Sequence, residues 1–280
     1  MTKNKTIFLG IAATLIALHS VSAAAQEVKI ATDGGYPPFN SQDSSGNVIG
    51  FEADLYKDLC KRIEKTCTMS VTDWDGIIPS LNQGRFDAIM AGMSITEDRK
   101  KVVAFSKPYA DLPTVIIVNR DNELSKLNIG ISDITFGEMS AEEDTALKKL
   151  QEALKGKTIA VQTSTVHQKF SESVFKDSTV QTYDTMENAG LDLASGRVDA
   201  FITDLSFLKD FAKNEQGKAL VQIGPNLFGG ALGEGRAMAL NKNNPQLVEQ
   251  FDKAIDASIA DGTVTKLSQQ WFGFDVTPKH

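Results

Sequence analysis

The chain has 280 residues, 41% of them hydrophobic, and a formal net charge of -7. This length suits one large domain or two smaller ones with sizeable cores. An acidic chain without a basic stripe argues against a nucleic-acid-binding protein, because such proteins place clustered lysines and arginines against phosphates.

The N-terminal segment is typical of a cleaved secretory signal peptide, which we assign to residues 1–25. It has a basic start at Lys3 and Lys5, an apolar stretch over residues 7–18, and small residues for cleavage at 23–25. The alternative is a transmembrane anchor, but this stretch is shorter than the roughly 20 residues that a spanning helix needs. We therefore expect an exported, soluble protein.

Short apolar runs alternate with helical patterns along the rest of the chain. Strands are predicted at residues 28–31, 68–71, 88–90, 115–118, 158–161, 180–183 and 200–202. Helical patterns lie between them, including Phe51 to Glu64 and Thr165 to Val174. This alternation predicts an α/β fold with mostly parallel sheets and binding loops at the strand ends.

Two stretches of the sequence resemble each other. Residues 75–90 and 186–202 both place Gly-Arg-x-Asp-Ala after a helical pattern and before an apolar strand. Gly84 and Gly196 suit the end of a helix, where a positive φ is needed. The repeated unit predicts a two-lobed α/β protein.

Cys60 and Cys67 are the only cysteines of the chain. Two cysteines in an exported protein favour a disulfide, which should stabilise the fold by about 2–3 kcal/mol. A zinc site would need further ligands, and the three histidines are His19, in the signal segment, His167 and His280. We expect neither a metal nor a cofactor.

Four motifs follow one another in the first half of the chain. They are TDGGYPPF at residues 32–39, GFEADL at 50–55, WDGIIPSL at 74–81 and DAIMAGMSITEDR at 87–99. In this order they resemble the polar amino-acid-binding proteins of bacterial ABC importers, in particular the lysine/arginine/ornithine, histidine and octopine/nopaline binders. The resemblance runs from about Val28 to Phe274. It implies a type II-like periplasmic-binding-protein fold, a periplasmic location, a monomer and delivery of a small solute to a membrane permease.

The resemblance also implies boundaries that local patterns do not give. Lobe 1 would comprise residues 26–110 and 236–280, and lobe 2 residues 114–232. The crossings at 110–114 and 233–236 are interpreted as hinges; for the glycines of 229–235 the alternative is a flexible surface loop. Residues 127–154 look like an insertion shared with the octopine/nopaline branch.

Arg99 is the strongest candidate for binding. It follows a turn into a short helix, where free backbone N–H groups attract anions, and a guanidinium grips a carboxylate with two prongs. By resemblance, Arg99 and Ser94 hold the α-carboxylate of the ligand, with help from the Gly92 backbone. The alternative is a surface arginine in a run of charges.

Tyr36 and Trp74 are candidates for an aromatic clamp around an aliphatic or guanidinium side chain. A place in the core is the alternative for both. Asp33 is placed to pair with a cationic side chain, although it could instead form the turn before Gly34 and Gly35. Opine-binding relatives tend to carry Glu at this point.

Lobe 2 contributes a strand that leads into a helix N-terminus. By resemblance Thr165 and nearby N–H groups share the carboxylate, and Val161 and Ser164 line the same loop. His167 is a candidate for a second ligand carboxylate, or simply a histidine on a surface helix.

The residues leave the ligand open between two kinds. Asp204 matches the acid that pairs with the α-ammonium of a free amino acid. Ala91 and Gly92 replace two serines of the lysine/arginine type, which widens the site as in the opine branch. Arginine, ornithine, lysine, histidine and arginine-derived opines all remain candidates.

Two other classes of protein are alternatives to a binding protein. An enzyme of the cyclohexadienyl-dehydratase kind needs an acid or base poised against its substrate, whereas each acid here has a binding role. No serine–histidine–aspartate set, metal cluster or phosphate loop is apparent in the sequence. The sensor module of a receptor would need a membrane helix after Phe274. We therefore expect a protein that is not an enzyme.

Overall fold

A computed structural model describes residues 27–137 and 139–278. The predicted signal peptide lies outside the described residues. Within the described part, no helix combines the length and apolar character that crossing a membrane requires.

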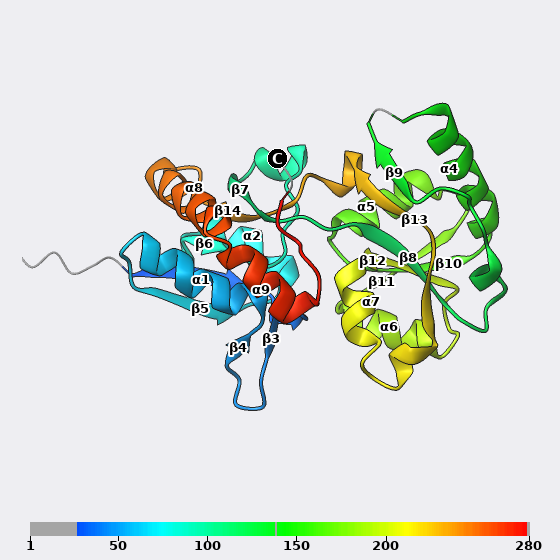
Figure 1. The fold of residues 1–280 in the computed structure, drawn as a ribbon, viewed down its shortest axis with the longest axis horizontal. Coiled ribbons are helices and arrows are strands. Elements are labelled where there is room, and N and C mark those ends of the chain that lie inside the picture. The colour runs from blue at the N-terminus through cyan, green and yellow to red at the C-terminus, as the bar shows by residue number, and fades with distance from the viewer. Residues whose placement is uncertain (1–26, 138, 279–280) are drawn as a thin grey trace, which may run out of the picture.

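The first of two large sheets has the strand order β5-β1-β6-β14-β7 (Figure 1). Strand β1 is parallel to β5 and β6, whereas β14 is antiparallel to β6 and β7. The strands are β1 (Val28–Thr32), β5 (Cys67–Val71), β6 (Ala88–Ile89), β7 (Ala104–Ala110) and β14 (Arg236–Leu240). Its helices are α1 (Phe51–Arg62), α2 (Trp74–Asn82), α3 (Glu97–Lys100), α8 (Pro245–Ala260) and α9 (Thr263–Phe272). We call this unit lobe 1.

Helices cover both faces of the lobe 1 sheet, and its central strands β1, β6 and β14 are largely buried. Ile30 of β1 belongs to the cluster that includes residues of α1, α8 and α9. Its neighbour Ala31 belongs to a separate cluster with Ile77 and Leu81 of α2. Successive side chains of a strand point to opposite faces, so α2 covers one face and α1, α8 and α9 cover the opposite one.

The second large sheet, in what we call lobe 2, has the order β11-β10-β12-β8-β13-β9. Strand β10 is parallel to β11 and β12, β8 is antiparallel to β12 and β13, and β9 is parallel to β13. The strands are β8 (Thr114–Asn119), β9 (Asp133–Phe136), β10 (Thr158–Gln162), β11 (Thr179–Tyr183), β12 (Ala200–Asp204) and β13 (Leu220–Gly229). The helices are α4 (Ala141–Leu154), α5 (Val166–Val174), α6 (Met186–Ala194) and α7 (Leu205–Phe211), with short 3₁₀ turns η1 (Glu123–Lys126), η2 (Gln216–Ala219) and η3 (Gly230–Leu232).

Two neighbouring segments join the lobes. The chain leaves lobe 1 between β7 and β8, at residues 111–113, and returns between β13 and β14, at residues 230–235 (Figure 1). The two paths lie side by side, since Arg236 pairs with Ala110 and Leu227 pairs with Thr114. Because β14 is inserted between β6 and β7, the lobe 1 sheet is assembled from both parts of the chain.

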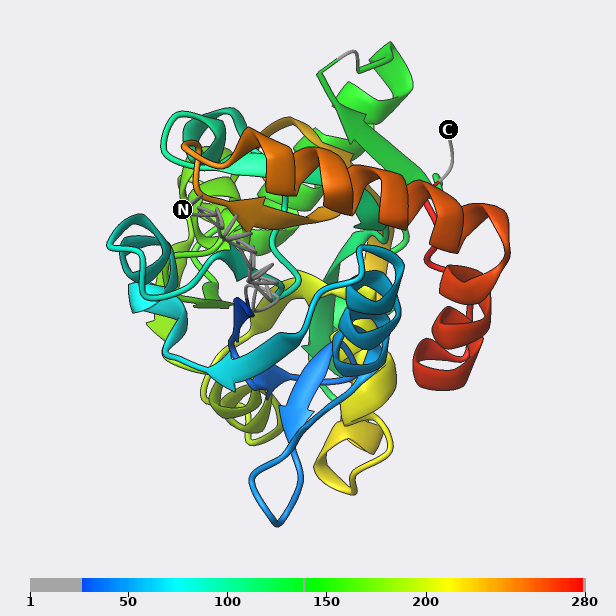
Figure 2. The same ribbon diagram turned by 90° about the vertical axis from the view of Figure 1, so that its left-hand side faces the viewer.

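A small sheet of β2 (Gly35–Tyr36), β3 (Asn40–Gln42) and β4 (Val48–Ile49) completes lobe 1. Its β3–β4 hairpin projects from the body of the molecule in both ribbon views (Figures 1 and 2).

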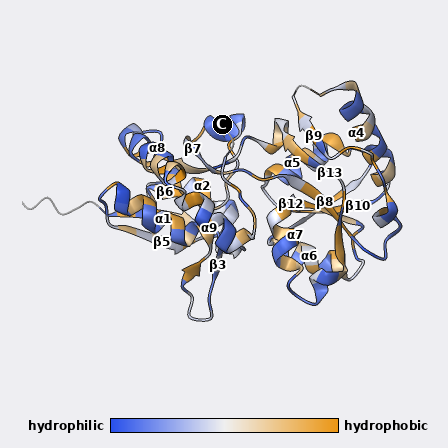
Figure 3. Cartoon of the chain, viewed as in Figure 1, coloured by the Kyte–Doolittle hydropathy of each residue, from blue (hydrophilic) through white to orange (hydrophobic). Residues whose placement is uncertain are grey.

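The hydropathy of the residues follows the layers of the fold. The central strands are largely apolar, and the outer helices show polar stretches (Figure 3).

The predicted two-lobed α/β fold is confirmed, and all seven predicted strands are present. The sheets are mixed rather than mostly parallel, because β7, β8, β13 and β14, which flank the crossings, bring antiparallel pairs into both lobes. Gly84 and Gly196 both have φ of 74° just after their helices, as predicted. Cys60 and Cys67 form the predicted disulfide between α1 and β5.

Residues 127–154 form β9 and α4 at the outer edge of lobe 2. At the start of α4, Ser140 and Glu143 form a reciprocal capping box, in which each side chain accepts from the other residue's backbone N–H. This segment therefore extends the sheet at the edge next to β13.

Candidate ligand-binding site

A cavity lies between the two lobes and is lined by residues of both. Lobe 1 contributes Asp33, Tyr36, Trp74, Ala91, Gly92, Ser94 and Arg99, and lobe 2 contributes Gln162, Thr165, Val166, His167, Met186 and Asp204. Most of these residues lie at or just beyond the carboxyl ends of β1, β6, β10 and β12. Ligands of α/β proteins typically bind at this edge of a sheet.

The lobes touch directly across this cavity. The Trp74 indole Nε1 donates to the carbonyl oxygen of Ser164 at 3.3 Å, and Lys169 Nζ lies 3.2 Å from Asp98 Oδ2. The Tyr36 hydroxyl donates to Asp204. The structure is therefore a closed arrangement of the two lobes.

Arg99 is a cation without a carboxylate partner in the described part of the chain. Its Nη1 donates to the carbonyl oxygen of Ser94 at 3.0 Å, and its guanidinium lies 5.4 Å from the centre of the Trp74 ring. The acids of its own helix pair with the neighbouring lysines instead: Glu97 with Lys100 and Asp98 with Lys101. Burial, and secondly repulsion from Arg236, lower the pKa of Arg99 to about 10. A bound carboxylate would favour the charged guanidinium and so offset both effects.

Asp33 is an acid without a cationic partner among the described residues. Burial is the main cause that raises its pKa to about 6, and the charge of Asp73 adds to the rise against a backbone hydrogen bond from Gly35. A desolvated carboxylate of this kind gains from a cation placed beside it.

Tyr36 packs tightly against the loop after β6. Gly92 has φ of 58°, and a Cβ built there would lie 2.4 Å from Tyr36 Cε1. The Gly92 N–H donates to Glu52 Oε1 at 2.7 Å, and the buried Glu52 also accepts from Asn40 and Tyr109. The Tyr36 ring therefore fills the space that a side chain at Gly92 would occupy, and a site widened by Ala91 and Gly92 stays a prediction.

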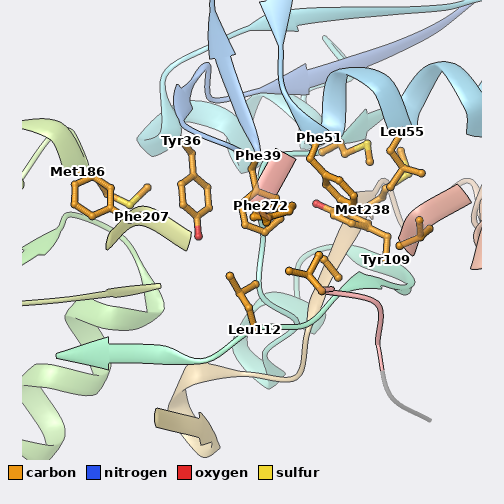
Figure 4. Packing of buried hydrophobic residues seen from close by; sticks show 14 of the residues in the cluster. Tyr36, Phe39, Phe51, Leu55, Tyr109, Leu112, Met186, Phe207, Met238 and Phe272 are labelled. Atoms are coloured by element: carbon orange, nitrogen blue, oxygen red, sulfur yellow. The ribbon is translucent and has the colours of Figure 1, made fainter. Parts of the chain in front are cut away.

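The Tyr36 ring also links the cores of the two lobes. It lies between Phe39 of lobe 1 and Met186 of lobe 2 in the close view (Figure 4). All three residues belong to one apolar cluster that spans both lobes, and the ring centroids of Tyr36 and Phe39 are 4.8 Å apart. Tyr36 therefore has a core role as well as a place in the cavity wall.

The lobe 2 wall is built on the turn from β10 into α5. Thr165 caps α5: its hydroxyl accepts from the Gln168 N–H at 3.2 Å and donates to the Gln162 carbonyl oxygen at 2.7 Å. The hydroxyl is thus committed to the turn. The backbone N–H groups of the first turn, which have no partner within a helix, are what this wall offers to an anion.

Asp204 is the most heavily engaged group of the cavity. It accepts hydrogen bonds from Tyr36 and from Nη2 of Arg236, and His167 Nε2 lies 3.4 Å from its Oδ1. Burial alone would raise the pKa of Asp204, but attraction to Arg236 and to His167 outweighs burial and holds the pKa below its usual range. Asp204 is therefore an ionised, buried carboxylate. His167 Nε2 also lies 3.1 Å from the Thr114 hydroxyl, so this histidine is buried and not on the surface.

Ten of the twelve predicted site residues line the cavity, and Val161 and Ser164 do not. Val161 is buried in the lobe 2 core, because it alternates along β10 with Gln162, which faces the cavity. Ser164 is exposed and lines a neighbouring cavity together with Lys169.

Four residues at or beside the cavity were not predicted: Gln162, Val166, Met186 and Arg236. Arg236 had the clearest signal in the sequence. It is the one charged residue in the otherwise apolar run from Arg236 to Leu240, directly after the glycines of the crossing segment.

The sequence profile of the bacterial extracellular solute-binding proteins, family 3, matches residues 28–274. An octopine-binding periplasmic protein of Rhizobium meliloti is 35% identical, over 91% of this chain and 94% of the relative. The ABC transporter arginine-binding protein 1 of Escherichia coli (strain K12) is 32% identical, over 94% of this chain and 98% of the relative.

Solved structures agree with these relatives. An ancestral arginine-binding protein bound to arginine superimposes with a TM-score of 0.72 and 32% identity, covering 88% of this chain and 98% of the other. An ancestral amino-acid-binding protein described as a precursor of cyclohexadienyl dehydratase has a TM-score of 0.71 and 30% identity, covering 88% of this chain and 95% of the other.

Proposed function

This chain belongs to the bacterial extracellular solute-binding proteins of family 3, and from that premise we propose that it captures a cationic amino acid or an arginine-derived opine. The solute would be bound in the periplasm, in the cavity between the lobes, and delivered to the membrane permease of an ABC importer. The relatives named for octopine and arginine support this class of solute.

The observation that carries the proposal is a pair of unsatisfied charges in one cavity. Arg99 has no carboxylate partner and Asp33 has no cationic partner among the described residues, and burial disfavours the charged form of each. A ligand with a carboxylate at one end and a cation at the other would satisfy both. Trp74 lines the same cavity and supplies a flat face for the apolar part of such a ligand.

Capture would proceed by closure of the lobes about the two crossing segments. Lobe 1 holds Asp33 and Arg99, so an open form could bind the ligand first on that lobe. On closure, the turn before α5 and Asp204 of lobe 2 would then contact the same ligand. Only interactions that are made in the closed state and not in the open state favour closure.

The binding would leave the solute chemically unchanged. Asp204 is ionised and already paired with Arg236. Asp33 and Arg99 are the groups that fit the two ends of a zwitterion. The named relatives are binding proteins, which agrees with this function, although one structural neighbour is described as the precursor of a dehydratase.

Isothermal titration calorimetry of the mature chain tests the proposal. The panel comprises arginine, ornithine, lysine, histidine and N-(1-carboxyethyl)arginine, with glutamate as an acidic control. We expect saturable 1:1 binding of at least one basic compound at micromolar concentration or below, equivalent to about -8 kcal/mol or more favourable. Absence of binding across the panel would contradict the proposal, as would turnover of prephenate or arogenate by the same preparation.

A further inference from the structure

Glu52, in the first turn of α1, is a fully buried carboxylate outside the cavity wall. It belongs to the motif at residues 50–55, none of which lines the cavity between the lobes. Burial raises the pKa of Glu52, against hydrogen bonds from Tyr109, Gly92 and Asn40 that lower it, and no cation among the described residues pairs with it. A buried acid without a cation is costly, so a position that only had to pack would be better filled by an apolar side chain.

Each oxygen of Glu52 accepts from an N–H group. Oε1 accepts from the Gly92 N–H at 2.7 Å, and the Tyr109 hydroxyl donates to the same oxygen. Oε2 accepts from the Asn40 side-chain amide at 2.6 Å. The Asn40 oxygen accepts from the Gly34 N–H at 2.7 Å, which fixes the amide with its nitrogen towards Glu52. A continuous bridge of hydrogen bonds thus runs from Gly34 through Asn40 and Glu52 to Gly92.

This bridge joins two loops of lobe 1 that line the cavity. Gly34 follows Asp33 in the loop after β1, and Gly92 lies in the loop after β6. The two strands are parallel neighbours. Beyond their ends, no backbone hydrogen bond joins residues 33–36 to residues 91–94 in the part of the chain that the structure describes. Side chains therefore connect these loops where the strand pairing has ended.

Resting on the proposed function, we propose that Glu52 is a positioning residue that sets the distance between the two ends of the ligand site in lobe 1. The loop after β1 carries Asp33 for the cationic end, and the loop after β6 leads to Arg99 for the carboxylate. Tyr36 packs against Gly92 and prevents the loops from approaching, and the hydrogen bonds of Glu52 prevent them from separating. Glu52 thus acts on the ligand through these loops without touching it.

Glu52→Gln is the sharpest test because it turns one oxygen into a donor and keeps the shape of the side chain. The new amide nitrogen faces either the Gly92 N–H or the Asn40 nitrogen, so two donors meet in the bridge. A flip of Asn40 does not remove the conflict, because its nitrogen then meets the Gly34 N–H. One loop must therefore shift, and we expect the affinity for the ligand to fall at least about tenfold.

A second substitution restores the bridge. In Asn40→Asp combined with Glu52→Gln, the new amide donates to the new carboxylate, whose other oxygen accepts from the Gly34 N–H. The amide oxygen still accepts from the Gly92 N–H. The number of buried acids is unchanged, and we expect this double variant to bind within about threefold of the natural chain. A residue that only stabilises the fold would lower the melting temperature without this loss and recovery of affinity.

Asp87→Asn is the matched control. Asp87 also accepts from a backbone N–H, that of Lys29 at 2.8 Å, and so links β1 and β6 at the ends away from the cavity. It should leave the affinity unchanged. Isothermal titration calorimetry with arginine and with N-(1-carboxyethyl)arginine measures binding to all these chains, and circular dichroism melting measures their stability.

The outcomes separate the role of Glu52 from the proposed function. Natural affinity in a folded Glu52→Gln chain would overturn the role of Glu52 and leave the proposed function intact, as would a folded double variant without recovery. If Glu52→Gln does not fold, Asn40→Leu decides in its place, because it severs the bridge while Glu52 stays bound to Gly92; it should bind at least about tenfold more weakly, and natural affinity would overturn the role. Absence of binding to the natural chain across the whole panel would refute the proposed function, and this role with it.

Discussion

The hydroxyl of Tyr36 in lobe 1 donates a hydrogen bond to the carboxylate of Asp204 in lobe 2, 168 residues later in the sequence. The two residues were expected to contact different parts of one ligand. Their direct contact shows that the closed arrangement is held partly by a hydrogen bond between two residues that line the cavity.

Tyr36→Phe removes this contact and keeps the ring in the core. A hydrogen bond to a charged group is worth about 1.5–3 kcal/mol, so the unliganded protein should shift towards open forms by roughly tenfold or more. Small-angle X-ray scattering should show a larger radius of gyration without ligand and an unchanged value at ligand saturation. The same radius for variant and natural chain without ligand would contradict this role of the hydroxyl.

Arg99→Met should have opposite effects on binding and on stability. Loss of a two-pronged carboxylate contact should cost roughly 3–6 kcal/mol, which is at least a hundredfold in affinity. Because the guanidinium is desolvated and unpaired, its removal should raise the melting temperature of the unliganded protein by about 2–4 °C. Thermal shift assays with and without ligand measure both effects. Lys100→Met, next to it on the exposed face of α3, should change neither; a natural affinity in Arg99→Met would refute the assignment.

The affinity for a cationic ligand should fall as the solution becomes acidic. Asp33 has a pKa of about 6 in the unliganded protein, and a cation beside it lowers that pKa. The ligand thus prefers the ionised form, so binding is fully present above pH 6 and weakens by about tenfold per pH unit below it. Calorimetry between pH 4.5 and 8 measures this slope. Asp33→Asn should bind more weakly and without the slope, and a slope that survives the substitution would assign it to another group.

Gly92→Ala should destabilise the protein by more than the backbone strain at a positive φ alone would cost. The added Cβ would lie 2.4 Å from Tyr36 Cε1 at a φ of 58°, so both backbone strain and a clash are expected. Gly196→Ala is the matched control, because it has φ of 74° with nothing within 4 Å. Chemical denaturation should show Gly92→Ala to be at least about 1 kcal/mol less stable than Gly196→Ala. Equal losses would show that the Tyr36 ring moves aside freely.

The strands and the α/β class could be predicted from the sequence because short apolar runs with regular spacing are typical of buried strands. The sequence did not reveal the antiparallel pairs of β14, since this strand pairs across the chain with β6 and β7. Long-range pairing depends on the path of the whole chain and leaves no local pattern.

Most of the site could be predicted because its residues follow recognisable strands and turns. Val161 was misplaced by one position: only alternate residues of β10 face the cavity, and Gln162 is the one that does. Arg236 was missed because its role depends on Asp204, which a separate strand brings next to it. Charge compensation between distant residues becomes visible only once the strands are placed.

The insertion of β14 between β6 and β7 has a consequence for how the protein matures. A chain that emerges from its N-terminus onwards can complete the lobe 2 sheet once residue 229 is available, whereas β7 has no partner strand in lobe 1 until residues 236–240 arrive. Lobe 2 can thus fold to its native structure while the sheet of lobe 1 is still incomplete. During that interval the newly exported polypeptide exposes the unpaired edge of β6 to chaperones and proteases.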